Sequence, residues 1–109
     1  MSHRIRLILS TFADEATASA AVRVLLEERL IACGNMIPGV RSVYRWKGSV
    51  EDASEIQVLL KTDQDHAARC MERLAELHPY EVPEILLLGV EEASAPYAAW
   101  IRDSLRKTE

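Results

Sequence analysis

The chain has 109 residues, 49% of them hydrophobic and 28% charged, and a formal net charge of −4. This composition is typical of a single globular domain spanning residues 1–109. No apolar run approaches the roughly 20 residues of a membrane-spanning helix. The basic residues are scattered in an acidic chain, unlike a nucleic-acid-binding surface. Because no secretory segment opens the chain, we expect a cytoplasmic protein that binds neither membrane nor nucleic acid.

The first predicted elements are a strand and a helix. The run over residues 5–11 is rich in strand formers and apolar on both faces, as in a central strand. Asp14 then offers an N-cap. Apolar residues recur at spacings of three and four over 15–31, which predicts an amphipathic helix, and Gly34 follows as a stop.

A long hairpin is predicted next. A short extended piece over 35–37 ends at Pro38, and alternation over 40–50 then predicts a strand. The polar cluster 51–54 is expected to form the turn, and 55–62 the returning strand. Arms of about ten residues exceed the usual five or six, so the hairpin should extend beyond its own sheet.

The second half predicts a helix, a strand and a last helix. Asp63 or Asp65 would cap a helix that runs to His78, and a strand covers 84–90. Ser94 would cap the final helix, with Pro96 in its first turn. One face of that helix should carry Tyr97, Trp100, Ile101 and Leu105.

The order of these elements predicts an α+β fold, a ferredoxin-like split β-α-β sandwich with an antiparallel sheet and both main helices on one face. The strands are nevertheless apolar on both faces, as in Leu7, Ile8 and Leu9. Because two helices cover only one face, the other face would expose a large apolar patch. We therefore expect the last helix or another subunit to cover it, and predict an oligomer.

The segment between the second helix and the fourth strand contains two prolines, Pro79 and Pro83, which stiffen the backbone. It carries His78, Tyr80, Glu81 and Glu84, side chains that could hold a ligand. The alternative is a rigid connector with a packed Tyr80 and solvated carboxylates.

Two motifs are distinctive: Ser42-x-Tyr44-x-Trp46-x-Gly48 and His78-Pro79-Tyr80-x-x-Pro83-Glu84. Shorter segments support them along the chain: Ser10-Thr11 with Asp14-Glu15, residues 30–35, 37–40 and 60–62, and Tyr97 with Trp100. Together they resemble the CutA family of divalent-cation tolerance proteins. The resemblance implies a ferredoxin-like fold related to PII-type signalling proteins, a homotrimer, no known catalytic reaction, and binding of copper or another divalent metal ion.

The copper ligands proposed for bacterial members are a cysteine on the first strand and a His-His pair before Pro-Tyr. These positions hold Ser10, Leu77 and His78 here. Only His78 keeps its family side chain, and one imidazole is a poor copper site. His78 could instead be a cation favoured by the end of its helix. Met1-Ser2-His3 would offer nitrogen donors to Cu(II) at a free N-terminus.

The remaining candidates are aromatic or charged side chains expected near subunit boundaries: Tyr44, Trp46, Lys61, Tyr80, Glu84, Tyr97 and Trp100. They could form a cleft for a metal ion or a small anion. The aromatics could equally be interface anchors, and Lys61 a solvated lysine or the partner of Glu84. Cys33 and Cys70 are expected to be buried thiols rather than a disulfide.

Two functions follow. The first is a trimeric CutA-type protein that binds a metal ion or small ligand between subunits. The alternative is a non-catalytic trimeric scaffold or signalling protein without a metal site.

Overall fold

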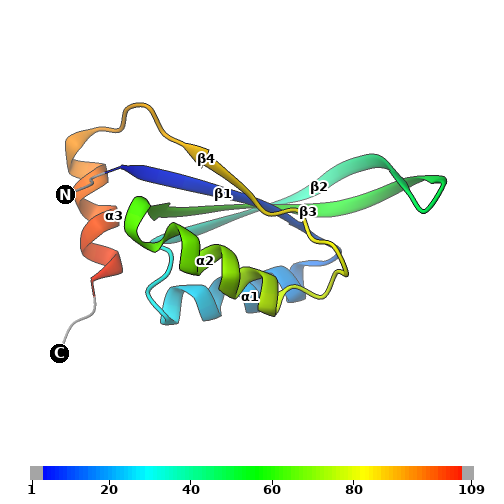
Figure 1. Cartoon of the computed structure of the whole chain (residues 1–109), viewed down its shortest axis with the longest axis horizontal. Helices are drawn as coiled ribbons and strands as arrows, with labels where there is room; N and C mark the ends of the chain where they lie inside the picture. Colours follow the sequence, from blue (N-terminus) through cyan, green and yellow to red (C-terminus); the bar gives the residue numbers. More distant parts are fainter. Residues whose placement is uncertain (1–3, 107–109) are drawn as a thin grey trace.

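The computed structural model describes residues 4–106; Met1, Ser2 and His3 lie outside it. Its elements are β1 (Ile5–Phe12), α1 (Glu15–Glu27), β2 (Cys33–Trp46), β3 (Ser49–Asp63), α2 (Gln64–Leu77), β4 (Leu86–Gly89) and α3 (Ala95–Leu105) (Figure 1). The strands form one antiparallel sheet in the order β2-β3-β1-β4. This order confirms the predicted ferredoxin-like α+β fold.

Short polar side chains begin all three helices. Asp14 accepts a hydrogen bond from the Thr17 N–H at 2.8 Å, and Asp63 rather than Asp65 accepts one from the His66 N–H at 3.1 Å. At the start of α3, the Ser94 hydroxyl oxygen accepts a hydrogen bond from the Tyr97 N–H. Each bond satisfies a backbone donor that the first helical turn leaves free.

Helix α1 ends four residues before the predicted boundary. Arg29 adopts a left-handed backbone with φ of 60°, and the Leu30 N–H donates back to the Leu25 carbonyl at 3.0 Å. This is the geometry that commonly closes a helix. Apolar periodicity continues through Leu30 and Ile31 because both are buried in the core after the helix has ended.

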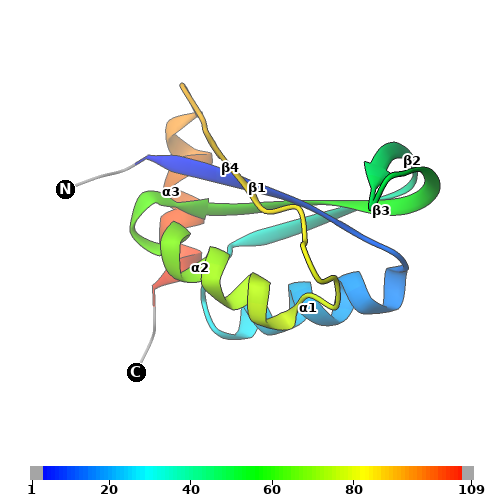
Figure 2. The ribbon, with the colours of Figure 1, turned by 45° about the vertical axis from the view of Figure 1, so that its right-hand side comes forward.

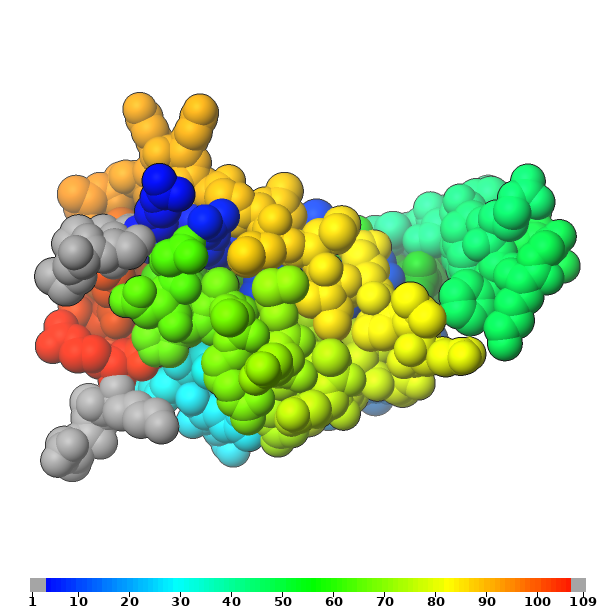
Figure 3. Space-filling view, viewed as in Figure 1, coloured from blue at the N-terminus to red at the C-terminus, as the bar shows by residue number. Residues whose placement is uncertain are grey.

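The hairpin turn lies at Lys47 and Gly48, so the turn predicted at 51–54 is wrong. Both residues have positive φ, 49° and 83°, as a two-residue hairpin turn requires. Residues 51–54 instead continue β3 and pair with β2; Asp52, for example, lies opposite Val43. Polar residues are tolerated there because this part of the hairpin projects beyond the helices (Figures 1 and 3).

Strand β2 passes through Pro38 and Gly39 without ending. The register with β3 shifts between Ile37 and Val40, which marks a bulge, and Gly39 has φ of 76°. Pro38 has no N–H to donate to the neighbouring strand, and a bulge lets such a residue remain within a strand. The separate extended piece and strand predicted here are therefore one strand of 14 residues.

Helices α1 and α2 lie together on one side of the sheet (Figure 2). The main core forms between them and alternate strand residues: Ile8, Phe12, Ile56, Val58 and Leu60 from the sheet, with Ala18, Ala21, Val22, Leu25, Cys70 and Leu74 from the helices. Cys70 is buried and free, as predicted, and burial raises the pKa of its thiol to about 12.

The opposite face of the sheet is largely uncovered. The register places Leu7, Leu9, Leu59, Leu86 and Leu88 there as cross-strand neighbours. All four residues of β4 are exposed, Leu86 to 54%. Helix α3 covers only one end, where Ile101 and Leu105 pack on Ile5 and Ala32. Tyr97 and Trp100 stay exposed instead of joining this cluster, which corrects the single apolar face predicted for α3.

Gly34 gives a direct test of the packing between β2 and α1. A Cβ at this position would lie 2.6 Å from Cγ1 of the buried Val22. We expect Gly34→Ala to lower the free energy of unfolding by about 1–3 kcal/mol, because valine is stiff and the core is filled. The measurement is urea denaturation at one fixed protein concentration. Val22→Ala in the Gly34→Ala background should recover part of the loss; strictly additive losses would contradict this packing.

A candidate ligand-binding cleft beside the hairpin

A cavity of about 570 Å³ lies where the hairpin faces the connection between α2 and β4. Figure 3 shows the hairpin projecting past residues 81–84, which are yellow in that view. Its walls come from the end of β1, from both hairpin strands and from the connection: Thr11, Ser42, Tyr44, Trp46, Glu55, Tyr80, Glu81, Val82 and Glu84. We call this cavity the hairpin cleft.

Four of the residues selected from the sequence meet in the hairpin cleft. Tyr44 and Trp46 share a face of β2, as their alternation predicts, and Tyr80 and Glu84 approach from the connection. Residues far apart in the sequence are thus brought together by the hairpin folding beside the proline-rich segment.

Glu55 is a residue of the cleft that the sequence does not single out. It is only 6% exposed, and its Oε2 accepts a hydrogen bond from the Tyr80 hydroxyl at 2.6 Å. Burial, with the adjacent carboxylate, raises the pKa of Tyr80, so the phenol remains a proton donor. Nothing in the local sequence distinguishes Glu55 from the exposed acids Glu51 and Asp52 before it in β3, because its hydrogen-bond partner Tyr80 lies 25 residues further along the chain.

His78 joins the cleft to the end of β1. Its Nε2 lies 2.8 Å from the Thr11 carbonyl oxygen, and its Nδ1 accepts a hydrogen bond from the Tyr80 N–H at 3.2 Å. Since a carbonyl can only accept and an N–H can only donate, the ring is neutral with its proton on Nε2. The ring also stacks on Phe12, with centroids 4.1 Å apart. Both nitrogens therefore hold backbone, and neither is open to a metal ion in this conformation.

The other two family ligand positions, Ser10 and Leu77, do not form a metal site either. Ser10 is fully buried between the sheet and the helices, and its hydroxyl has no partner among residues 4–106. Leu77 is half-buried and packs against the main core. Within the described chain, no three His, Cys, Asp or Glu side chains are grouped so that they could hold a metal ion.

Lys61, Tyr97 and Trp100 form a separate group beside α3. The Lys61 ammonium lies 3.3 Å from the Tyr97 hydroxyl, and the Tyr97 and Trp100 rings stack with centroids 5.5 Å apart. Lys61 is six residues beyond Glu55 along β3, about 20 Å at the usual rise of a strand. The five aromatic side chains therefore do not form one wall within the chain, and Lys61 does not pair with Glu84.

Cys33 opens β2 and pairs across the sheet with Lys61. It is half-buried on the uncovered face and free, so its predicted place in the core is wrong. It lies on the same face as the uncovered leucines, because Lys61 is also the cross-strand neighbour of Leu7.

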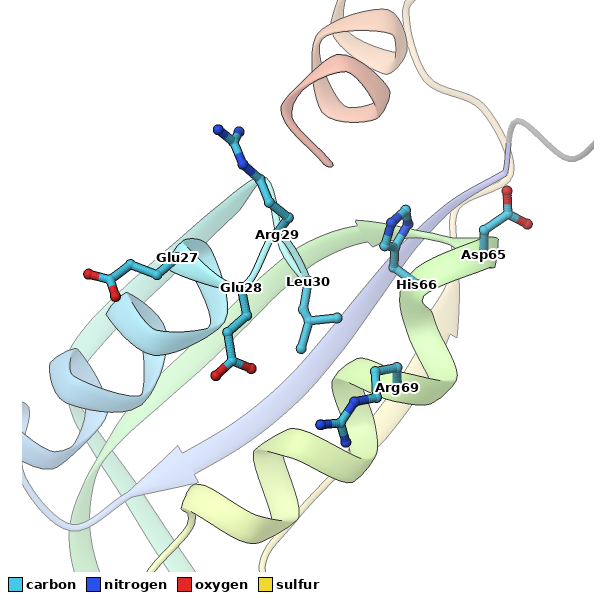
Figure 4. Close-up of a pocket in the computed structure, with 7 residues that line it drawn as sticks. All are labelled: Glu27, Glu28, Arg29, Leu30, Asp65, His66 and Arg69. Atoms are coloured by element: carbon cyan, nitrogen blue, oxygen red, sulfur yellow. The ribbon is translucent and has the colours of Figure 1, made fainter. Parts of the chain in front are cut away.

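A second hollow of about 740 Å³ lies between the end of α1 and the start of α2 (Figure 4). Three of its ionisable side chains form ion pairs: Glu28 pairs with Arg73, Arg69 with Glu72, and His66 with Asp63. Arg29 points toward α3 and donates to the Ser104 carbonyl at 2.9 Å. Of these pairs, only Glu28–Arg73 joins the two helices. The hairpin cleft is the stronger candidate, because it brings together four of the residues selected from the sequence.

The chain was compared with known proteins. The family model of the CutA1 divalent ion tolerance proteins matches residues 6–104. The chain belongs to the CutA1 family. The Divalent-cation tolerance protein CutA of Pectobacterium atrosepticum is 42% identical over 100 residues, which cover 92% of this chain and 91% of that protein. The family predicted from the two motifs is therefore confirmed.

Solved structures of the family share the fold. The CutA structure from Xylella fastidiosa has a TM-score of 0.91 at 40% identity, covering 94% of this chain and 98% of that one. A CutA from Archaeoglobus fulgidus, described as a periplasmic divalent cation tolerance protein, has a TM-score of 0.89 at 26% identity, covering 94% and 99%. Within residues 4–106 of the present chain, no helix is long and apolar enough to cross a membrane.

The neutral His78 gives the protein a predictable response to acid. Burial lowers the pKa of His78 below its ordinary value of 6.5, although its hydrogen bond to Thr11 and the charge of Glu55 oppose the shift. The unfolded chain therefore takes up this proton at a higher pH than the folded chain does. The resulting stability is complete above pH 6.5 and falls as the pH drops toward the folded pKa.

We expect His78→Gln to remove this part of the pH dependence. The glutamine amide can still donate to Thr11, but it does not titrate. Urea denaturation of both proteins should give unfolding free energies that converge as the pH falls below 6.5. Curves that fall in parallel would mean that His78 is not held neutral.

Proposed function

We propose that the chain acts as a non-catalytic homotrimer that contributes to divalent-cation tolerance by holding a cation or small ligand in clefts between subunits. The observation that carries the proposal is the uncovered leucine face. Five leucines on adjacent strands form an apolar patch of a kind that isolated subunits rarely expose. Burial of this face against identical chains would place the hairpin clefts beside subunit boundaries.

The hairpin supports the same assembly. Val43 and Val50 near its tip are 63% and 65% exposed, and β2 and β4 are open edges of the sheet. Long exposed edges invite pairing with another chain. A hairpin that lies across a neighbouring subunit would cover these valines and close one side of its cleft.

For the ligand, the cleft favours a cation. Glu55, Glu81 and Glu84 line it, and no basic side chain does. Carboxylate oxygens suit hard divalent ions better than copper, which prefers nitrogen and sulfur ligands. Copper at His78 would require its ring to leave Thr11 and Tyr80. A small anion is the weaker alternative and would need Lys61 of another subunit.

The scaffold alternative has its own support. His78, Tyr80 and Glu55 are bonded to one another or to backbone, which is what a purely structural connector requires. We propose the cytoplasm as the compartment, because two free cysteines are ordinary under reducing conditions. Cell fractionation tests this assignment: recovery in the periplasm, the compartment given for the A. fulgidus relative, would overturn it.

The assembly can be tested on the leucine face. Leu88→Glu places a charge among Leu7 and its neighbours, so sedimentation equilibrium should show the trimer dissociating to smaller species. Leu26→Glu is the matched control, since Leu26 is also exposed but lies on α1. Dissociation of both variants, or of neither, would contradict a trimer built on this face.

Metal binding can be tested by native mass spectrometry of protein lacking Met1–His3, with one equivalent of Cu(II) or Zn(II) per chain. We expect Glu84→Gln to reduce the metal retained by the trimer several-fold, since it removes an anionic oxygen ligand, and His78→Gln to leave it unchanged. Loss only in His78→Gln would restore the imidazole as the ligand. A trimer that retains no metal would favour the scaffold.

A further inference from the structure

We propose that the hairpin cleft binds an organic ammonium ion, a primary or methylated amine carried on a small apolar body. The proposal rests on the proposed function in that it concerns the same cleft, and it specifies the chemical class of the cation. Three independent features support it: a buried carboxylate, an aromatic wall, and an ammonium group of the chain itself at the mouth.

The first feature is Glu55. The residue is only 6% exposed and lines the cleft, and within residues 4–106 its side chain receives the hydrogen bond from Tyr80, on Oε2. A carboxylate can accept about four hydrogen bonds, and a buried charge is costly unless it is paired. The other oxygen, Oε1, can therefore accept a hydrogen bond from a charged donor in the cleft, and an ammonium group is such a donor.

The second feature is the aromatic wall. Tyr44, Trp46 and Tyr80 face a volume of about 570 Å³, which matches small-molecule sites of roughly 300–1,000 Å³ and far exceeds the space around a bare metal ion. Aromatic faces attract organic cations through their negative quadrupole. They supply no metal ligands here, because a protonated phenol and an indole coordinate metals poorly. The walls therefore favour a cation with an apolar body.

The third feature is Lys47, in the hairpin turn. Its ammonium lies 5.6 Å from the centroid of the Trp46 ring and 3.7 Å from Oε1 of Glu81. The mouth of the cleft thus already holds an ammonium between an aromatic face and a carboxylate. Both members of the Lys47–Glu81 pair are mostly exposed, so the contact is weak and a ligand could displace it.

The test uses fluorescence of Trp46 in the full chain carrying Trp100→Phe, so that Trp46 is the only tryptophan. The probes are n-butylammonium and trimethylammonium chloride, both of which carry an N–H donor. n-Butanol is the neutral control, and sodium butyrate is the anionic control. We expect saturable changes with the ammonium ions alone. Equal responses to butanol would show apolar binding without charge recognition and would overturn the proposal.

Three variants locate the interaction. Glu55→Gln keeps an acceptor for Tyr80 but removes the charge, and should weaken ammonium binding about tenfold or more, the equivalent of one charge-assisted hydrogen bond. Glu92→Gln makes the same charge change at an exposed position before α3 and should have no effect. Lys47→Ala should tighten binding, because it removes the competing ammonium. Unchanged affinity in Glu55→Gln would overturn the proposal.

Sedimentation and Zn(II) titration of the same protein separate this inference from the proposed function. A trimer that binds Zn(II) but no ammonium probe would refute the ammonium site alone. A trimer that binds neither would refute the ammonium site and the cation-binding part of the proposed function, and would leave the scaffold. Ammonium binding by a monomer would support the site and refute its place between subunits. A monomer that binds neither would refute both.

Discussion

Strand β1 is apolar on both faces, and the rest of the structure depends on how each face is covered. Ile8 and Phe12 face α1 and α2 and are completely buried. Leu7 and Leu9 face the other way, where only the end nearest α3 is covered. Burial of a leucine side chain is worth about 1.5–3 kcal/mol, so a partner on this face, where Leu86 and Leu88 are exposed and Leu7, Leu9 and Leu59 half-buried, would stabilise the sheet. The strand that organises the core therefore also carries the apolar residues of the uncovered face, on which the proposed trimer rests.

The end of β1 also connects this core to the hairpin cleft. The Thr11 carbonyl receives His78, the His78 ring receives the Tyr80 backbone, and the Tyr80 hydroxyl reaches Glu55 on β3. This chain of hydrogen bonds fixes the proline-rich connection against two strands. His78, which the family resemblance proposes as a metal ligand, instead holds the connection against β1 through hydrogen bonds to Thr11 and Tyr80. The cleft therefore has a rigid inner wall on the connection and an outer wall on the projecting hairpin.

Local features of the fold follow from short-range chemistry and were predictable. Asp14, Asp63 and Ser94 cap their helices because a carboxylate or hydroxyl can reach a backbone donor two or three residues ahead. The turn predicted at residues 51–54 is wrong, because polar residues indicate a turn only where the strand beside them must face a core. In the projecting arm no core exists, and Lys47-Gly48 forms the turn through its positive φ angles.

The sequence by itself determined the family, the order of elements, the α+β class and the presence of an apolar second face. These properties are carried by motifs, caps and periodicity, which act over a few residues. Only the tertiary structure decided that Glu55 is buried, that both nitrogens of His78 are occupied, and that Lys61, Tyr97 and Trp100 lie apart from Tyr44, Trp46 and Tyr80. Those facts depend on which strand lies beside which loop, because burial and hydrogen bonding of a side chain are set by neighbours distant in the sequence.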